Sequence, residues 1–316
     1  MSASFKNSGW LDGLNDTVMT DDIRGEFAKG YLEQMITDKE GNVIGVPGYS
    51  GYLAFWVNQK IMDNAGITSI DTKEDFKKYM SAASVNGTYG YGGSWEKTYV
   101  FNEIAQFVNM FGGDYFDWTR PENKEAIQFL YDMVKNNETP IDQIADKYEQ
   151  MNPKANDGKY GCWFMWGLGS DYQKAGMLGD DKIHMAMVPS MTDDGNRAIF
   201  TDSWSYVLNS ASKNKEAAIK FLKYMASEGG MEASYKAFDR YPARRDVAEK
   251  VVPDSDPAKE MYTRYASECN VQGRPMLPQT MEFITDMGTI YQSCMKGEIS
   301  VDDFCKKAQD LVDKYK

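Results

Sequence analysis

The chain has 316 residues, a length that favours two domains, each large enough to bury a core of its own. Its formal net charge of −12, with no block of Lys and Arg, argues against nucleic acid and against an anionic membrane surface as partners. No apolar run approaches the roughly 20 residues that a membrane-spanning helix needs.

Four segments have the apolar spacing of amphipathic helices. The first follows Thr72 in a capping-box-like start, and the second opens at Pro121. The third runs from Ser212 and is expected to end at Gly229-Gly230, and the fourth follows Ser300. The residues predicted to face inward are Phe76, Tyr79, Met80 and Ala83, then Ala126, Phe129, Leu130 and Met133, then Ala218, Phe221, Leu222 and Met225, and finally Phe304, Ala308, Leu311 and Val312.

Short runs of β-forming residues lie between these helical segments. Because strands separated by long helices are typical of α/β proteins, we expect that fold class. The chain has neither an internal repeat nor a low-complexity linker, so two domains would be joined by structured segments. The predicted strands are 43–46, 53–57, 162–166, 184–188 and 204–208, the last with Trp204, Tyr206 and Leu208 in alternation.

No pattern of metal or cofactor binding is present in the sequence. The four cysteines lack a CxxC pair and histidine partners at metal spacing, and the glycines of 87–93 match no nucleotide-binding motif. The sequence allows two alternatives for the cysteines: buried thiols, or a disulfide between Cys294 and Cys305. The only histidine, His184, lies in a strand-like run and is interpreted as structural.

Residues 41–67, GNVIGVPGYSGYLAFWVNQKIMDNAGI, combine two glycine-rich turns with an aromatic strand and a helix that stops at Ala-Gly. This stretch resembles the "GxxYGVP" hairpin, Tyr-Asn-Lys strand end and Ala-Gly-Ile helix end of ABC-importer extracellular solute-binding proteins, of the maltose-binding-protein-like carbohydrate class (family 1). The Tyr-Asn-Lys is here Val57-Asn58-Gln59-Lys60, a modest departure. Further family-like motifs follow in family order from Trp10 onward, at 72–76, 111–113, 159–167, 212–218, 241–244 and 297–303.

The resemblance implies a two-lobed periplasmic-binding-protein-like α/β fold, with hinge crossings and an interlobe cleft. Lobe one would contain residues 1–50 and 205–271, and lobe two residues 51–204 and 272–316. The expected crossings are 47–52, 200–206 and 272–278, with glycines absorbing backbone rotation in the first. The first residues, MSASFKNSGW, resemble neither a signal peptide nor the family's initial βαβ segment, so lobe one is expected to be incomplete.

The same resemblance implies a binding protein and no enzyme. Such a protein captures a carbohydrate, here expected to be an oligosaccharide, by hinge closure and delivers it to the membrane subunits of an ABC permease. It needs no cofactor and no metal. The full-length form would be extracellular, either periplasmic or anchored to the membrane as a lipoprotein.

Sugar recognition needs flat aromatic platforms beside carboxylates, amides and arginines that hydrogen-bond in fixed directions. Trp56 and Trp163 lie inside strand-like runs and are interpreted as core. Residues of these types at element ends and in the expected crossings are predicted to bind the ligand. They are Tyr49, Trp95, Glu96, Trp166, Asp202, Trp204, Arg240, Gln279 and Glu282.

Two other functions stay open. One is an acidic glycoside hydrolase with two catalytic carboxylates, although the chain has no GxSxG motif and a single histidine. The other is a truncated form that no longer binds small molecules and self-associates through apolar surface left uncovered.

Overall fold

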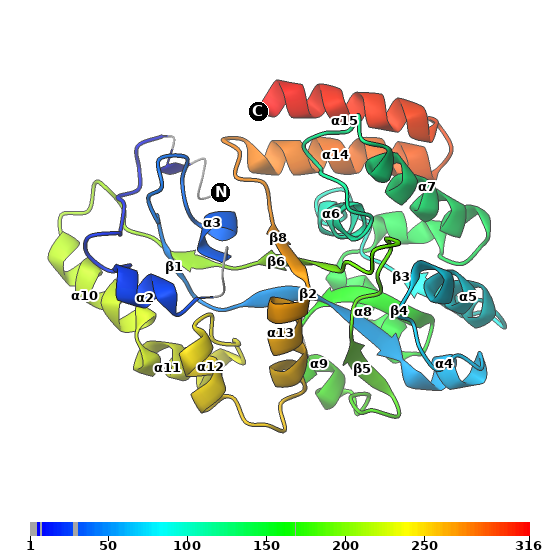
Figure 1. The fold of residues 1–316 in the computed structure, drawn as a ribbon, viewed down its shortest axis with the longest axis horizontal. Helices are drawn as coiled ribbons and strands as arrows, with labels where there is room; N and C mark the ends of the chain where they lie inside the picture. Colours follow the sequence, from blue (N-terminus) through cyan, green and yellow to red (C-terminus); the bar gives the residue numbers. More distant parts are fainter. Residues whose placement is uncertain (1–4, 7, 28–30, 168) are drawn as a thin grey trace. The chain divides into compact units, whose positions relative to one another are not determined.

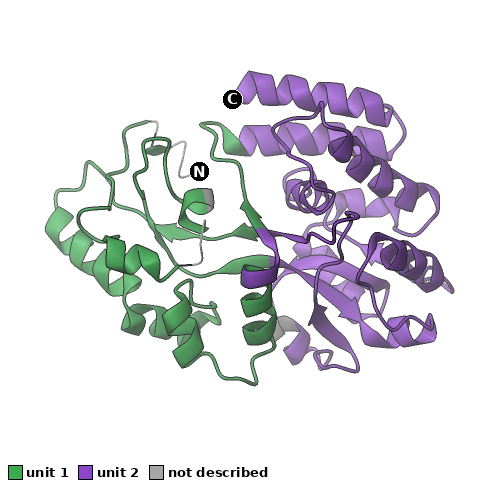
Figure 2. Cartoon of the chain, in the orientation of Figure 1, with its two compact units in different colours: residues 1–52, 201–266, 271–280 green, residues 53–200, 267–270, 281–316 purple. Residues whose placement is uncertain are grey.

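The computed structural model describes residues 5–6, 8–27, 31–167 and 169–316 of the chain. The chain divides into two compact units, which are coloured separately in Figure 2. Unit 1 contains residues 1–52, 201–266 and 271–280, and unit 2 contains residues 53–200, 267–270 and 281–316. Residues 51–52, 201–204 and 272–280, which the sequence analysis assigned to the second lobe, therefore cluster with unit 1, and residues 267–270 cluster with unit 2.

Unit 1 is mainly helical and holds a two-stranded antiparallel sheet (Figure 1). Its strands β1 (Val46–Pro47) and β7 (Ser205–Tyr206) pair with Val46 opposite Tyr206. Leu14, Ile44 and Leu208 belong to the apolar core of this unit. Its helices are α2 (Asp21–Gly25), α3 (Tyr31–Met35), α10 (Lys215–Ala226), α11 (Glu228–Phe238), α12 (Arg245–Val251) and most of α13 (Pro257–Glu268).

Unit 2 is built around strand β2 (Gly51–Asn58), whose eight residues are all buried. β2 lies antiparallel to β4 (Tyr160–Trp166) and to β5 (Ile183–Ala186), and β4 lies parallel to β3 (Tyr89–Gly92). Near-continuous apolar composition is typical of strands that are covered on both faces. The helices of this unit are α4 (Gln59–Asn64), α5 (Lys73–Ala83), α6 (Phe101–Met110), α7 (Pro121–Lys135), the 3-10 helix η1 (Ile141–Ala145), α8 (Tyr148–Asn156), α9 (Gly169–Lys174), nearly all of α14 (Thr280–Met295), and α15 (Val301–Tyr315).

At two of the crossings the chain passes between the units inside a strand. β2 crosses between Tyr52 and Leu53, and β6 (Ala198–Asp202) crosses between Phe200 and Thr201. On the unit 1 side the two strands pair antiparallel, with Gly51 opposite Asp202, and β8 (Asn270–Gly273) is the next strand of the sheet. A Cβ at Gly51 would lie 2.8 Å from the main-chain oxygen of Asp202, so this glycine is needed for the close approach of two strands.

The four predicted helices are present as α5, α7, α10 and α15. At the start of α5 the Thr72 hydroxyl accepts a hydrogen bond from the Asp75 amide, and the Asp75 carboxylate accepts one from the Thr72 amide, which is the predicted capping box. All the inward positions predicted for α5 and α7 are buried. Local capping and apolar spacing were therefore sufficient to locate these helices.

Two details of the third helix were predicted wrongly. α10 ends at Ala226, because Ser227 caps a new helix, α11, by accepting a hydrogen bond from the Gly230 amide at 3.3 Å. The expected stop at Gly229-Gly230 thus lies in the first turn of α11. Phe221, predicted to face inward, is 52% exposed, while Leu222 on the same helix reaches the core.

The strands differ more from the prediction. Segment 43–46 contributes only its last residue to β1, and segment 204–208 is reduced to the two residues of β7. Trp204, which the alternation placed beside Tyr206 and Leu208, has 77% of its surface exposed. β3 was not predicted, because its sequence, Tyr-Gly-Tyr-Gly, is typical of a turn.

Gly229 and Gly230 are adjacent in α11 but should respond oppositely to alanine. A Cβ at Gly230 would lie 2.1 Å from the Tyr224 main-chain oxygen of α10, whereas at Gly229 the nearest atom is 3.9 Å away. We expect Gly230→Ala to lower the free energy of unfolding by about 1 to 3 kcal/mol through overpacking. Gly229→Ala should raise it by about 0.5 to 1 kcal/mol, because alanine is the better helix former. Urea unfolding measures both, and two changes of the same sign would contradict this account of helix packing.

Candidate functional site

In unit 1 three loops are joined at Tyr49. Its main-chain oxygen accepts hydrogen bonds from the Tyr31 hydroxyl at 3.1 Å and from the Ser203 hydroxyl at 2.6 Å. On either side of Tyr49, the Gly48 amide donates to the Trp204 oxygen and the Ser50 amide donates to the Tyr241 oxygen, both at 2.8 Å. Residues 48–50, 203–204 and 241 are thereby held together by the main chain, which gives the side chains between them fixed positions.

Charged groups surround the Tyr49 side chain. The guanidinium of Arg240 lies over its ring, 4.8 Å from the centroid. Asp202 forms an ion pair with Arg274, with 3.1 Å between the Nε and Oδ2 atoms, and also accepts a hydrogen bond from the Ser203 amide. We call Tyr49, Asp202, Ser203, Trp204, Arg240 and Arg274 the Tyr49 cluster.

Burial shifts the acid–base behaviour of this cluster. It raises the pKa of Asp202 above its usual range, and the Arg274 guanidinium opposes the rise. Burial also raises the pKa of the Tyr49 phenol, and the negative charge of Asp202 raises it further. The cluster therefore combines a phenol, two guanidiniums and the carboxyl of Asp202, which are groups that hydrogen-bond to hydroxyls, and the guanidiniums also bind anions.

In unit 2 the predicted residue Trp166 lies at the end of β4 among half-buried aromatic rings. Its indole Nε1 donates a hydrogen bond to the Tyr148 hydroxyl at 2.9 Å, and that hydroxyl also accepts one from the Asn102 amide at 2.9 Å. The ring of Tyr99 meets Tyr148 edge-on, with 4.7 Å between the centroids. We call Tyr99, Tyr148 and Trp166 the Trp166 cluster.

Trp95 is not a ligand-binding residue in this structure, contrary to the prediction. It is 0% exposed, and all its contacts lie inside unit 2. Its indole donates to Glu103 at 3.0 Å, and its ring meets Tyr291 edge-on at 5.3 Å. Its neighbour Glu96 is half-buried and accepts hydrogen bonds from the amide and hydroxyl of Thr98, so it orders the turn before α6.

The two remaining predicted residues are exposed and lie at the start of α14. Gln279 directly precedes this helix and belongs to unit 1, whereas Glu282 is in its first turn and belongs to unit 2. Sequence analysis missed Arg274, although it is the only cation in the predicted crossing 272–278. It also missed Tyr99 and Tyr148, which nothing in their local sequence distinguishes from other helix-flanking tyrosines.

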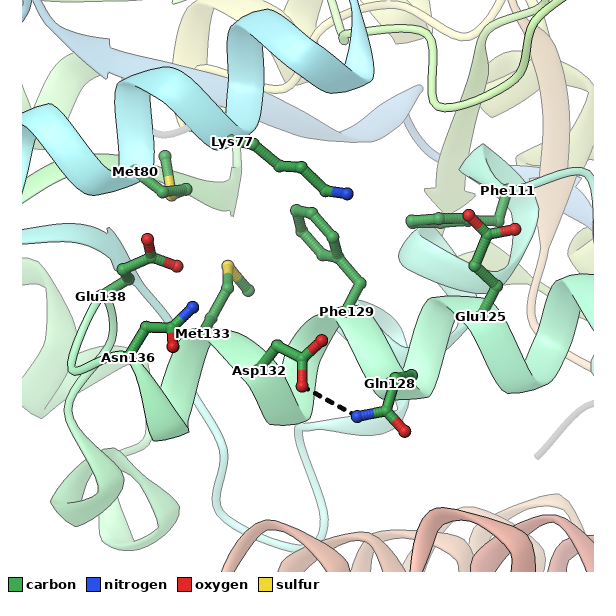
Figure 3. Close-up of a pocket in the computed structure, with 10 residues that line it drawn as sticks. All are labelled: Lys77, Met80, Phe111, Glu125, Gln128, Phe129, Asp132, Met133, Asn136 and Glu138. Atoms are coloured by element: carbon green, nitrogen blue, oxygen red, sulfur yellow. Dashed lines mark hydrogen bonds between the residues drawn. The ribbon is translucent and has the colours of Figure 1, made fainter.

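A groove of about 340 Å³ lies between α5 and α7 of unit 2 (Figure 3). Its floor is not available to a sugar ring, because Phe111 and Phe129 are only 3% and 7% exposed. The ammonium groups of Lys73 and Lys77 also lie over these rings, 5.7 Å and 6.0 Å from their centroids. The groove is therefore a solvated furrow with acidic and amide side chains at its rim and no open aromatic platform.

The family model of bacterial extracellular solute-binding proteins matches residues 1–232, which is more than half of the chain. The chain belongs to this family. This assignment confirms the resemblance found in the motifs and places the chain among binding proteins rather than enzymes. Proteins of the family typically act outside the cytoplasm.

Relatives of this solute-binding protein include the arabinooligosaccharide-binding protein of Halalkalibacterium halodurans, 28% identical over 234 residues. That alignment covers 69% of this chain and 51% of the relative, so the chain spans about half the length of the curated relative that it matches. Among solved structures, the sugar-binding protein MalE of Xanthomonas citri superposes with a TM-score of 0.82 at 15% identity, covering 99% of this chain and 81% of that one. Maltose-bound MalE3 of T. maritima gives a TM-score of 0.78 at 19% identity, with 99% and 81% coverage. These likenesses confirm the two-lobed α/β fold.

The remaining groups that could bind a metal or react are the acidic residues, the four cysteines and His184. Among the residues described by the structure, no cluster of three or more His, Cys, Asp and Glu could hold a metal, and no helix is long and apolar enough to cross a membrane. All four cysteines are free thiols, so the disulfide between Cys294 and Cys305 is not formed. Burial raises the pKa of these two thiols to about 12 and about 11. Burial lowers the pKa of His184.

Proposed function

We propose that this solute-binding protein captures a carbohydrate, namely an oligosaccharide, and delivers it to the membrane subunits of an ABC permease. The observation that carries the proposal is the Tyr49 cluster, where an aromatic ring, arginines and a carboxylate are held by three loops of one unit. These groups suit the hydroxyls of a sugar, while Trp204, which is 77% exposed, offers a flat apolar face beside them. The Halalkalibacterium halodurans relative is an arabinooligosaccharide-binding protein, which supports the same class of ligand.

We infer that the two units correspond to the two lobes of other family members and that the ligand is captured by hinge closure. A ligand then favours the closed form by its differential affinity for that form. The paired strands β2 and β6, both of which pass from one unit to the other, are the hinge segments of this proposal. Action at the cell surface or in the periplasm is part of the proposal, because the family is one of extracellular proteins.

The test is thermal unfolding of the chain with a panel of mono- and oligosaccharides. A ligand at about 100 times its dissociation constant stabilises the folded form by about 2.7 kcal/mol. We expect a rise in Tm with at least one sugar and a much smaller rise in Trp204→Ala, because the Tyr49 cluster loses its exposed aromatic face. Trp10→Ala is the matched control, since Trp10 is 58% exposed and belongs to neither cluster. Absence of any shift, together with no heat of binding by calorimetry, would refute the proposal.

A further inference from the structure

Arg240 forms no ion pair with any residue in the described part of the chain, although its ring partner and the residues on either side of it are held in place. Asp239 ends α11 in the left-handed conformation, with φ 53°, and its amide donates to the Tyr235 oxygen at 2.9 Å. The Arg240 guanidinium lies over the ring of Tyr49, 4.8 Å from the centroid. The next residue, Tyr241, is held by the Ser50 amide.

The charges around Arg240 leave its positive charge uncompensated. Asp202, the carboxylate of the Tyr49 cluster, already pairs with Arg274. Asp256 accepts hydrogen bonds from the Tyr235 hydroxyl at 2.7 Å and from the Ala258 amide at 2.9 Å, and Asp239 is exposed at the end of α11. The Tyr49 cluster therefore holds two guanidiniums for one carboxylate, in a chain whose net charge is −12.

We propose that the carbohydrate carries a carboxylate, as in a uronic acid, and that Arg240 binds this group and determines the specificity. The inference rests on the proposed function and names its substrate class. A guanidinium presents a planar fork that matches a carboxylate through two parallel hydrogen bonds. Tyr49 covers one face of the guanidinium, which leaves the N–H edge available and reduces the conformational freedom lost on binding.

The net charge makes this arrangement informative. A chain with a charge of −12 repels an anionic solute at long range, so an acidic ligand needs a local cation that the protein has not already neutralised. A site for neutral sugars needs no such excess, because hydroxyls carry no charge to compensate. The uncompensated guanidinium over the Tyr49 ring therefore indicates an acidic sugar.

The test compares matched ligands by calorimetry. Glucuronic and galacturonic acids and their short oligomers are each paired with the neutral hexose counterpart and with the methyl ester, which removes the charge and keeps the shape. We expect at least one acidic sugar to bind about tenfold to a hundredfold more tightly than its ester and its hexose, since this is the usual strength of hydrogen bonds to a charged group. Arg240→Met should abolish that preference, and Arg240→Lys should recover only part of it, because lysine keeps the charge and loses the fork.

Lys236→Met is the control for the loss of one positive charge close by in the sequence, in α11, which ends two residues before Arg240. Lys236 is exposed in the last turn of α11 and pairs with Glu232 at 2.7 Å, so its removal should leave the preference unchanged. Equal or tighter binding of the neutral sugars would overturn the inference and leave the proposed function standing. An acidic preference that survives Arg240→Met would also overturn it. Binding of no carbohydrate at all would refute both this inference and the proposed function.

Discussion

Trp95→Ala should lower the free energy of unfolding by about 3 to 5 kcal/mol, the usual cost of removing a large ring from a core. The ring is 0% exposed and contacts Tyr291, and its indole is one of three donors to the buried carboxylate of Glu103. Removing it therefore leaves both a cavity and a buried acceptor with one donor fewer. Urea unfolding of the variant measures the loss.

Trp204→Ala is the matched comparison, because both tryptophans were predicted to bind the ligand. Trp204 is 77% exposed, so its removal should change the free energy of unfolding by less than about 0.5 kcal/mol. If it provides a sugar platform, the same variant should bind the ligand about tenfold more weakly. Similar unfolding energies for the two variants would contradict the placement of Trp95 in the core of unit 2.

The four tryptophans Trp56, Trp95, Trp163 and Trp204 show which side-chain positions could be predicted from the sequence alone. Trp95 and Trp204 adjoin Ser or Asp at an element end, and that pattern does not reveal that Glu103 is buried and receives the Trp95 indole. The core assignment of Trp56 and Trp163 was confirmed, since both lie in apolar runs and both are 0% exposed. A continuous apolar run can be recognised in the local sequence. A hydrogen-bond partner that comes from another helix or strand cannot.

The same limit applies to the strands and to the Tyr49 cluster. The ion pair between Asp202 and Arg274 joins distant segments, and no local pattern predicts which of 35 Lys and Arg residues will meet this carboxylate. β3 was missed because its glycines are read as turn residues, yet a Cβ at Gly90 would lie 2.5 Å from the Met80 oxygen of α5. Glycine there serves the packing of a strand against a helix, a role visible only once both elements are placed.

The family motifs predicted more of the tertiary structure than the apolar periodicity of the helices did. An ordered set of short motifs between residues 41 and 303 was sufficient for the family, and the family supplied the two-lobed fold. Periodicity located four helices but failed at Phe221, because α10 turns Leu222 and Ala226 toward the core of unit 1. The family's motifs carry information about tertiary structure that a single amphipathic pattern lacks.

The stability of unit 2 should fall as the pH rises through 7, because of Glu103. Its side chain is 3% exposed and accepts hydrogen bonds from the Ser94 amide at 2.8 Å, the Trp95 indole at 3.0 Å and the Tyr91 hydroxyl. Burial raises its pKa from 4.5 to about 7, and the three hydrogen bonds oppose the rise without cancelling it. The folded state therefore binds a proton that the unfolded state releases between pH 4.5 and 7.

The direction of the pH effect follows from this difference. Below pH 4.5 the carboxyl is protonated in both states, and its contribution to stability is fully present; above pH 7 it is ionised in both, and the contribution is lost. The difference between the two pKa values corresponds to about 3 kcal/mol. Urea unfolding between pH 5 and pH 8 measures this loss.

Glu103→Gln separates this carboxyl from the other titrating groups. Glutamine cannot titrate, but its nitrogen cannot accept a hydrogen bond, so the variant loses at least one of the three accepted hydrogen bonds at every pH. That loss is constant, so the stability of the variant relative to the natural protein should rise by up to about 3 kcal/mol between pH 5 and pH 8. Glu138→Gln is the control in the same unit, since Glu138 is half-buried and burial raises its pKa too, while it takes no part in the hydrogen bonds of Trp95. If the natural protein instead gains stability over Glu103→Gln as the pH rises, the three hydrogen bonds outweigh burial, and the carboxylate is the form that holds Tyr91, Ser94 and Trp95 in place.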